Sequence, residues 1–303
     1  MRVAVTGSSG LIGSALVRAL EARGDQVVRV VRPDSPATRD TVVRWNPRAG
    51  TLSTDDLDHA GTIDAVVHLA GAGIAERRWS PARRREILAS RVESTSVLAA
   101  TLASRPGVTR VVSGSAIGYY GSRGDEVLDE SSARGTGYLA DVCDAWERAI
   151  QPARRPGTTV ACARTGIVMS ASGGALARQL PLFRAGLGGR LGSGHQWLSP
   201  ISLEDEVHAL LWIMDQGLDG PVNLVAPTPV TNRDFTAALG RAVHRPTIAA
   251  VPRAALSLAL GRDLADEAVL ASQRVTPRAL DDSGYRFRHR DIDAILGAAL
   301  AER

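Results

Sequence analysis

Lysine is absent from this sequence, so all 36 residues counted as Lys plus Arg are arginines. This absence excludes a Walker-A P-loop, a Schiff-base enzyme and any catalytic Tyr–Lys pair. Cysteine is nearly as rare, and the two residues Cys143 and Cys162 are too few for a disulfide framework or a four-cysteine zinc site. We also predict no metal site, because no metal-ligand spacing links the histidines His59, His68, His208, His244 and His289.

Long apolar runs are also missing. No stretch approaches the roughly 18 apolar residues that a membrane-spanning helix needs. Met1-Arg2 leads directly into Val3-Ala4-Val5, so we expect no signal peptide and a cytoplasmic location. The net charge of +4 over 303 residues is a weak argument for a nucleic-acid partner. We therefore expect a soluble globular protein with no nucleic acid and no membrane among its partners.

In the first half of the chain, short apolar runs alternate with helical patterns. The runs are rich in valine and almost continuously hydrophobic, as parallel strands are when helices cover both faces of a sheet. Strands are expected at residues 3–6, 26–31, 65–69, 109–113 and 158–163, and helices at residues 11–23, 81–104 and 136–150. This alternation predicts an α/β fold with a doubly wound parallel sheet of the Rossmann type.

The pattern loosens after about residue 170. Glycine-rich turns occur at Gly173-Gly174 and at 186–194, and helices are expected near 203–216, 232–243, 253–260 and 291–301. We predict two domains, one at 1–165 and a smaller C-terminal α/β lobe on the substrate side at 166–303. Ser80-Pro81 is typical of a helix start, with Ser as the cap and Pro first in the helix. The run Arg83-Arg84-Arg85 is interpreted as a solvated helix face.

A glycine-rich turn, Thr6-Gly7-Ser8-Ser9-Gly10-Leu11-Ile12-Gly13, lies between the first strand and the first helix. Its G-x-x-G-x-x-G spacing is a variant of the dinucleotide fingerprint. Glycine allows a tight turn and lets the backbone approach a pyrophosphate, while the helix N-terminus offers free N–H groups to the anion. We predict that Gly7, Gly10, Leu11, Ile12 and Gly13 bind a dinucleotide rather than form a purely structural turn.

Arg32 indicates which dinucleotide is bound. It ends the second strand, 19 residues after Gly13. An acidic residue at this point would bind the ribose 2′-hydroxyl of NAD, whereas arginine suits the 2′-phosphate of NADP. We predict NADP. Asp34 is the competitor and could serve NAD if the strand ended later, and Arg32 could also be a solvated surface residue.

Three further segments are possible parts of the site, and each also has a purely structural interpretation. His68-Leu69-Ala70-Gly71 ends a strand whose edge, in this fold, lies under the adenine and ribose, although an ordinary buried strand end would look the same. His195 and Trp197 lie in a glycine-rich loop that could close over a substrate or simply cover the surface. Trp146-Glu147 is interpreted as helix packing and a salt bridge.

The sequence resembles the short-chain dehydrogenase/reductase superfamily, in its extended or atypical branch. The resemblance extends to the "epimerase family protein" group of the short-chain-reductase-39U type and covers essentially the whole chain. In that group the C-terminal segment, about residues 251–300 here, has no known function. The motifs that carry the resemblance are Arg78-Trp79-Ser80, Ser90 to Thr95, Ser113 to Gly121, Trp146-Glu147, Gly186 to Trp197 and Ala226-Pro227.

The resemblance implies a set of cofactor contacts and one departure. Family members usually carry an aromatic residue and a histidine where this chain has Pro200 and Ser202, so the substrate side differs from the family pattern. Glu86 and Arg91 project about 140° apart on a straight helix, so both can reach one ligand only near a helix edge. The implied cofactor contacts are Gly7, Gly10, Gly13, Arg32, Leu69, Ala70, Glu86, Arg91 and Val168.

Ser115 and Tyr138 are the catalytic candidates that the resemblance implies. The superfamily places a lysine four residues after the tyrosine, and this chain has Val142 there. With a pKa of about 10, forming a tyrosine phenolate at pH 7 costs about 4 kcal/mol, and no lysine reduces that cost. A protonated Tyr138 can still donate to a carbonyl oxygen, so we expect reduction rather than alcohol oxidation. Tyr138 could also be only a packing aromatic.

Two functions follow from these observations. One is an NADP(H)-dependent oxidoreductase or epimerase acting on an unknown small molecule. The other is an NADP-binding redox sensor or interaction module without turnover, which the missing lysine favours. The name epimerase rests on superfamily similarity, which is a weak basis for assigning a reaction.

Overall fold

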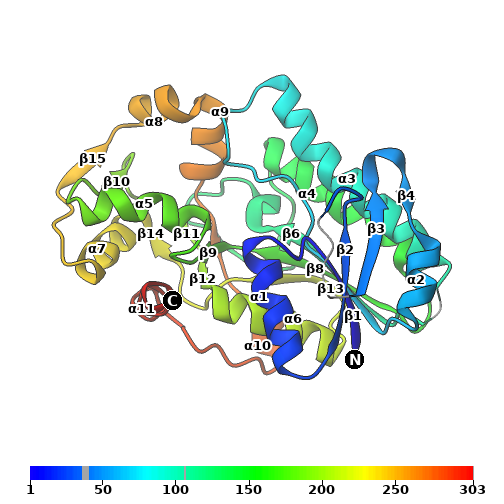
Figure 1. The fold of residues 1–303 in the computed structure, drawn as a ribbon. Coiled ribbons are helices and arrows are strands. Elements are labelled where there is room, and N and C mark those ends of the chain that lie inside the picture. The colour runs from blue at the N-terminus through cyan, green and yellow to red at the C-terminus, as the bar shows by residue number, and fades with distance from the viewer. Residues whose placement is uncertain (36–40, 106, 303) are drawn as a thin grey trace.

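The computed structural model describes residues 1–35, 41–105 and 107–302. Within these residues a central sheet of eight strands has the order β13-β8-β6-β5-β1-β2-β3-β4 (Figure 1). Neighbouring strands are parallel except for β3 and β4. The strands are β1 (Arg2–Thr6), β2 (Gln26–Val31), β3 (Thr41–Asn46), β4 (Thr51–Leu52), β5 (Ala65–His68), β6 (Arg110–Ala116), β8 (Thr159–Thr165) and β13 (Gly220–Leu224).

This topology confirms the predicted doubly wound sheet. From β1 the chain adds β2 and β3 on one side, and β5, β6, β8 and β13 on the other. The direction of winding therefore reverses between β1 and β5. Ligands bind at such a reversal, outside the carboxyl ends of the strands, because the following loops separate there. The first glycine turn and residues 69–71 both lie at this edge.

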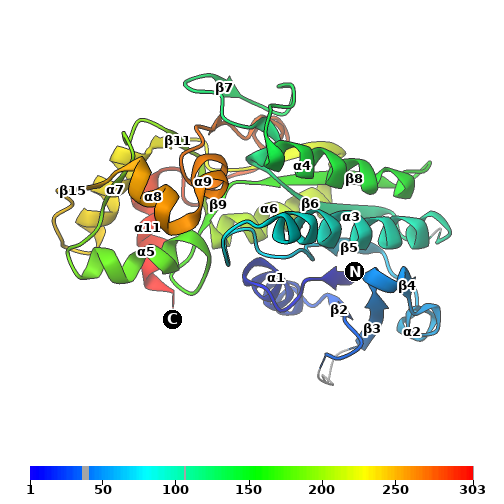
Figure 2. The ribbon, with the colours of Figure 1, turned by 90° about the horizontal axis from the view of Figure 1, so that it is seen from above.

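Helices cover the two faces of the sheet, which explains the continuous hydrophobic runs. In β1, Val3 and Val5 join the cluster that contains α1 (Leu11–Ala22) and α6 (Leu203–Gln216). Ala4 faces the opposite cluster, which contains α3 (Pro81–Ala103). Figure 2 shows α3 and α4 (Tyr138–Ala149) on the side of the sheet away from α1. Alternate residues thus point to opposite faces and are buried on both.

Ser80 and Pro81 start α3 as predicted. The Ser80 hydroxyl accepts the N–H of Arg83 at 3.1 Å, and Pro81 is the first helical residue. The remaining short elements of the first half are α2 (Thr54–Ala60), β7 (Val127–Leu128), η1 (Pro47–Ala49), η2 (Ile117–Tyr120) and η3 (Gln151–Ala153).

A smaller lobe follows the main sheet. Its own hydrophobic cluster joins α5 (Gly174–Arg184), α7 (Asn232–Ala242) and α11 (Ile292–Ala301). Helix α5 begins within the stretch where the sequence predicts only glycine-rich turns. The other elements are β9 (Ile167–Met169), β10 (Gly189–Leu191), β11 (Trp197–Leu198), β12 (Pro200–Ser202), β14 (Val230–Thr231), β15 (Ala249–Val251), α8 (Arg253–Leu260), α9 (Arg262–Leu264), η4 (Ala265–Val269), β16 (Arg274–Val275) and α10 (Arg278–Asp282).

The two halves of the chain are interleaved in space. After residue 165, β13 still pairs with β8 in the main sheet, and α6 packs with α1 against it. Strand β16 pairs with β7 of the first half. Residues beyond the predicted boundary therefore complete the first domain as well as building the lobe. Among the helices of the described residues, none is long and apolar enough to cross a membrane.

Candidate functional site

The glycine turn after β1 is built for close backbone contacts. Gly7 has a φ of +67°, and a β-carbon there would lie 2.8 Å from the carbonyl of Leu69. A β-carbon on Gly13 would lie 2.1 Å from the Gly7 carbonyl oxygen. A side chain at position 7 would therefore push the turn away from the end of β5, and one at position 13 would push the start of α1 away from the turn. The glycines draw the start of α1 close to Leu69 and Ala70, two further predicted cofactor residues.

The N-terminus of α1 carries no cap of its own. Gly10 occupies the cap position, no side chain accepts the N–H groups that follow, and the first turn holds no acidic residue. The N–H groups of Leu11, Ile12 and Gly13 lie in this first turn, where a helix has no internal acceptor for them. Free N–H groups and the positive end of the helix dipole together suit a phosphate. The turn therefore fits the pyrophosphate of a dinucleotide.

Arg32 immediately follows the last residue of β2 and is exposed. Since β2 ends at Val31, the later strand end that Asp34 would need does not occur. A turn follows, in which the N–H of Ser35 donates to the Arg32 carbonyl at 3.0 Å. Among the described residues, Arg32 forms no ion pair, so its guanidinium is available to a ligand phosphate. This arrangement favours the NADP interpretation over the NAD one.

A buried hydrogen-bond network fixes the end of β5. The Thr6 hydroxyl oxygen accepts the N–H groups of Leu69 and Ala70 at 3.1 and 3.2 Å. Both lone pairs are then used, so the hydroxyl donates its hydrogen to Nδ1 of His68, 2.7 Å away. His68 is consequently the Nε2–H tautomer and donates to the Thr95 hydroxyl at 2.9 Å.

His68 stays neutral in this network. Full burial lowers the pKa of His68 to about 3, because an imidazolium would lose its hydration. The network therefore holds the Leu69–Ala70 backbone against the glycine turn without adding charge. The sequence places His68 at a strand end that, in this fold, lies under the adenine and ribose, or at an ordinary buried strand end. It does not reveal the hydrogen bonds of His68, because Thr6 and Thr95 come from other segments.

Glu86 and Arg91 both hold the loop that follows β5, residues 71–79. Nη1 of Arg91 donates to the Ala72 carbonyl at 3.0 Å, and its guanidinium lies 5.0 Å from the Trp146 ring. Glu86 accepts from Arg77 of the loop at 2.6 Å. Two residues that point different ways on α3 thus reach one segment. That segment leads directly from Leu69 and Ala70, so both are placed to shape a cofactor site.

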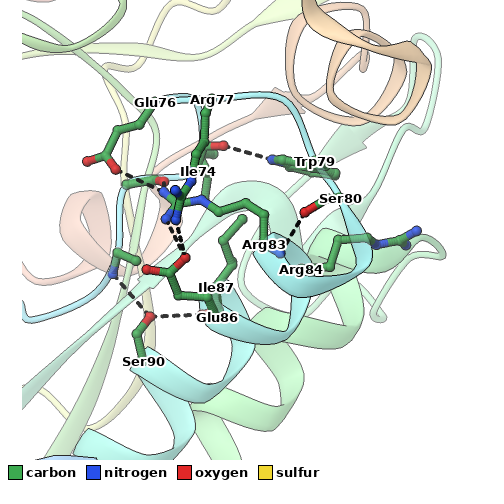
Figure 3. Close-up of polar contacts among 12 residues, drawn as sticks. Ile74, Glu76, Arg77, Trp79, Ser80, Arg83, Arg84, Glu86, Ile87 and Ser90 are labelled. Carbon is green, nitrogen blue, oxygen red and sulfur yellow. Dashed lines mark hydrogen bonds and ion pairs between the residues drawn. The ribbon is translucent and has the colours of Figure 1, made fainter.

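Arg83 corrects the interpretation of the three-arginine run. Its side chain is 3% exposed, and its guanidinium bonds both Glu86 and Glu76 at 2.9 Å. It also donates to the Gly73 carbonyl. Figure 3 shows Arg83 and Glu86 from α3 facing the loop that carries Glu76 and Arg77. The run is therefore not a solvated face throughout, and Arg83 joins loop 71–79 to α3.

Ser115 lies at the end of β6, where it meets a buried ion pair. Its hydroxyl donates to Oε1 of Glu147 at 2.7 Å. Arg164 binds both oxygens of that carboxylate, at 2.8 and 2.9 Å, and donates to the Tyr120 hydroxyl at 3.0 Å. Because Ser115 has one hydrogen, it offers a ligand only lone pairs in this conformation. The predicted salt bridge of Glu147 is present, but its bond to Ser115 is not foreseeable from the sequence.

Tyr138 is the first residue of α4 and does not meet Ser115 through any hydrogen bond of the described residues. Its hydroxyl donates to the backbone carbonyl of Arg84, and the Arg84 guanidinium lies 4.4 Å from its ring centroid. Burial is the largest cause that raises the pKa of Tyr138 above its ordinary value. Val142, at the lysine position of the superfamily, is buried among helix-packing residues.

The remaining candidates in the second half lie in the smaller lobe. Val168 in β9 borders the hydrophobic cluster that Ile12 and Leu69 also border. Nε2 of His195 accepts from Arg233 at 2.6 Å, and Trp197 donates to Asp125 at 2.8 Å.

The chain's departures from the family pattern have structural tasks. Ser202 is buried and caps α6, where its hydroxyl accepts the N–H of Asp205 at 3.0 Å. The carbonyl of Pro200 accepts the N–H of Ala226 at 2.8 Å. Ser202 therefore starts α6, and the Pro200 carbonyl joins β12 to the segment that follows β13. For metals, the described residues contain no group of three or more His, Cys, Asp or Glu side chains that could hold an ion.

Comparison with known families gives two matches along the chain. The sequence pattern of the NAD dependent epimerase/dehydratase family matches residues 3–225. A domain of unknown function matches residues 251–299. An epimerase family protein of Mycobacterium tuberculosis is 49% identical over 298 residues, which are 98% of this chain and 97% of that protein. The human epimerase family protein SDR39U1 is 34% identical over 311 residues, and the match covers 100% of this chain and 99% of that protein.

Solved structures show the same likeness in three dimensions. The crystal structure of human SDR39U1 (isoform 2) with NADPH has a TM-score of 0.87 and 32% identity, and each chain covers 100% of the other. A nucleoside-diphosphate sugar epimerase from Corynebacterium glutamicum has a TM-score of 0.79 and 36% identity, with 99% of this chain and 58% of that chain covered.

Proposed function

Because the chain belongs to the NAD dependent epimerase/dehydratase family, we propose that it binds NADP(H) and reduces or epimerises a small molecule. The observation that carries this proposal is the first turn, where Gly7 and Gly13 leave no room for side chains and α1 has an uncapped N-terminus. Arg32 beside that turn supports NADP over NAD. The crystallised NADPH complex of human SDR39U1 supports the same choice.

Different groups of residues would contact different parts of the cofactor. The N–H groups at the start of α1 would hold the pyrophosphate, and Arg32 would pair with the 2′-phosphate. Leu69 and Ala70, fixed by Thr6, would pack along the adenosine side. Loop 71–79, held by Glu86 and Arg91, would border the nicotinamide half. These positions follow from the strand ends at which the residues lie.

When bound, NADPH supplies a hydride to an electrophilic carbon such as a carbonyl carbon. The π electrons of the carbonyl move to its oxygen, and Tyr138 transfers its phenol proton to that oxygen. Tyr138 first exchanges its bond to the Arg84 carbonyl for one to the substrate. That carbonyl lies inside α3, where the helix already provides a donor, so the exchange leaves no unsatisfied group. The phenolate then regains its proton from water.

Isothermal titration with NADPH and NADH tests the cofactor proposal. Loss of a charge-assisted bond to the 2′-phosphate should weaken NADPH binding to Arg32→Ala about 10- to 100-fold, and NADH binding less than about threefold. Arg48→Ala is the matched control, because Arg48 is an exposed arginine on the short helix η1. Equal losses for the two nucleotides would show that Arg32 does not recognise the phosphate.

An NADP-binding module without turnover is the second candidate. Two observations favour it: Val142 stands where the superfamily has lysine, and the hydroxyls of Ser115 and Tyr138 both donate to groups of the protein. Absorbance at 340 nm, followed with NADPH and a panel of carbonyl compounds, separates the two candidates. Turnover that is lost in both Ser115→Ala and Tyr138→Phe supports the enzyme. Cofactor binding without turnover across the panel supports the module.

A further inference from the structure

The C-terminal segment of unknown function reaches back to the start of α4. At the cap position of α4, Gly137 has a φ of +108° and no side chain to accept helix N–H groups. Glu267 of η4 takes this task, because its Oε2 accepts the N–H of Leu139 at 2.8 Å. A carboxylate at this end also complements the helix dipole. The cap of α4 therefore comes from a residue 128 positions away.

The same segment is tied to the start of α3. Asp263 pairs with Arg84 at 3.1 Å. Nε of Arg78 donates to the Ala259 carbonyl at 3.0 Å, and the same guanidinium donates to the carbonyl of Leu258. In Figure 1 the strand-to-helix loop that leads into α3 runs beside α9. Residues 258–267 thus contact the first turns of both helices.

Tyr138 lies between these two helix starts. The Arg84 guanidinium covers its ring at 4.4 Å, and the Trp79 ring meets it edge-on at 5.2 Å. Its neighbour Leu139 is the residue whose N–H Glu267 accepts. A β-carbon on Gly137, on the other side of Tyr138, would lie 3.2 Å from the same Glu267 oxygen. The carboxylate is therefore fitted closely to the backbone that carries Tyr138.

We propose that Glu267 is a positioning residue, which fixes Tyr138 at the start of α4 and places a carboxylate against the backbone that carries it. The segment of unknown function then has a task in the site, because it holds the candidate acid. The proposal rests on the proposed function, since Tyr138 transfers a proton only if the chain turns a substrate over. Its contacts, however, can be measured without turnover.

The charges that face Tyr138 oppose one another. Arg83, Arg84 and Arg91 of α3 favour the phenolate and lower the pKa of Tyr138, whereas Glu267 and burial favour the phenol and raise it. Burial is the largest cause, and the net direction is upward. Glu267 thus acts in the opposite sense to the lysine of the superfamily pattern, which would stabilise the phenolate.

Alkaline titration of tyrosine absorbance at 295 nm tests the charge of Glu267. In each background the titration of a Tyr138→Phe variant is subtracted, so the difference reports Tyr138 alone. Glu267→Gln keeps an oxygen that can accept the Leu139 N–H but removes the charge, and it should lower the Tyr138 midpoint by about 0.5–1 pH unit. Because the chain has no lysine, its only side chains that are cationic at the alkaline end are arginines, and these stay charged through the tyrosine titration.

Asp266→Asn is the matched control. It removes the same charge one residue away, where Asp266 pairs with Arg253 at 2.7 Å and not with α4. We expect it to leave the Tyr138 midpoint unchanged. A midpoint that is the same in Glu267→Gln, Asp266→Asn and the unaltered chain overturns the charge part of the proposal.

Amide hydrogen exchange tests the positioning part. Glu267→Ala removes the acceptor, so the N–H of Leu139 should exchange about fivefold faster, while Glu267→Gln should restore most of the protection. Equal exchange in all three proteins overturns the positioning role. If the chain proves to have no turnover, the titration and exchange results still decide whether Glu267 holds Tyr138. The proposed function and this inference therefore fail separately.

Discussion

Glu206 should make the stability of this protein fall as the pH rises from weakly acidic to weakly alkaline. It lies in the first turn of α6, and its side chain is fully buried. Oε1 accepts the Thr165 hydroxyl at 2.8 Å, while Oε2 has no hydrogen-bond partner among the described residues. One hydrogen bond does not compensate for the lost hydration of a carboxylate, so burial raises the pKa of Glu206 to about 8.

The sign of the pH dependence follows from this shift. The unfolded chain releases the Glu206 proton near the ordinary value of 4.5, whereas the folded chain keeps it until about pH 8. Between these values folding takes up one proton, so the full stability contribution is present below pH 4.5 and is lost as the pH rises. Each pH unit changes the free energy of unfolding by up to about 1.4 kcal/mol, which gives at most about 5 kcal/mol across the window.

Glu206→Gln isolates this effect because the amide cannot ionise. Its oxygen can still accept from Thr165, but its buried NH₂ group lacks an acceptor and should cost about 1–3 kcal/mol at every pH. At about pH 5 the variant should therefore be less stable than the unaltered chain by that amount. At about pH 8 the difference in stability between the two proteins should become smaller or change sign, because only the unaltered chain has lost stability.

Urea unfolding of both proteins at several pH values between about 5 and 8 measures the difference. Other groups that titrate in this range are common to both proteins, so subtracting the two free energies removes their contribution. The difference should change by several kcal/mol in favour of the variant as the pH rises. A difference that stays constant with pH would refute the reasoning, because it would mean that Glu206 is already ionised in the folded chain.

Three further changes test the geometry of the site. Arg164→Met leaves the Glu147 carboxylate buried without its ion pair and should lower the free energy of unfolding in urea by about 3–5 kcal/mol, whereas Arg154→Met, which breaks an exposed pair with Asp219, should lower it by less than about 1 kcal/mol. Similar losses of stability in the two variants would argue against a structural ion pair at Ser115. Thr6→Val removes the acceptor of the Leu69 and Ala70 N–H groups and should lower the free energy of unfolding by about 2–4 kcal/mol, while Thr6→Ser should keep most of the stability. An unchanged melting temperature in Thr6→Val would contradict the hydrogen-bond network. Gly13→Ala places a β-carbon 2.1 Å from the Gly7 oxygen and should weaken NADPH binding at least about tenfold. Gly297→Ala, which has open space around it in α11, should leave NADPH binding unchanged. Tight binding of NADPH by Gly13→Ala would show that the turn does not approach the nucleotide.

Much of the fold could be predicted because its signals are local. Strand β2 and helices α6 and α8 begin and end at the predicted residues, and most others differ by one to three residues. Strand β3 and helix α5 could not be predicted in this way. Strand β3 alternates buried with exposed residues, so it lacks the continuous apolar run from which β1, β2, β5, β6 and β8 of the sheet are predicted. Helix α5 starts with glycine and contains Pro181, both of which are poor helix signals.

The features of the site that are local in sequence could also be predicted, whereas those that depend on tertiary packing could not. The glycine turn and Arg32 are separated by fewer than about twenty residues and are joined by one strand–helix–strand unit, so their spacing alone predicts a cofactor site. Ser115 and Tyr138 could be matched to superfamily positions, but not their hydrogen-bond acceptors, Glu147 and the Arg84 carbonyl. Which acceptor a hydroxyl finds depends on how helices pack on the sheet, and a sequence pattern does not contain that information.

The chemistry of the site consequently depends on contacts between distant parts of the chain. The bonds of residues 258–267 to Arg78, Arg84 and Leu139 join positions 181, 179 and 128 residues apart. These contacts place the Glu267 carboxylate at the helix start that carries the candidate acid, while the Arg84 guanidinium covers the ring of that acid. A site of this kind favours keeping the phenol proton until a substrate oxygen accepts it, and it disfavours the phenolate that alcohol oxidation would need. In the proposed reaction, burial of Tyr138 and the Glu267 charge of this segment both act in favour of reduction.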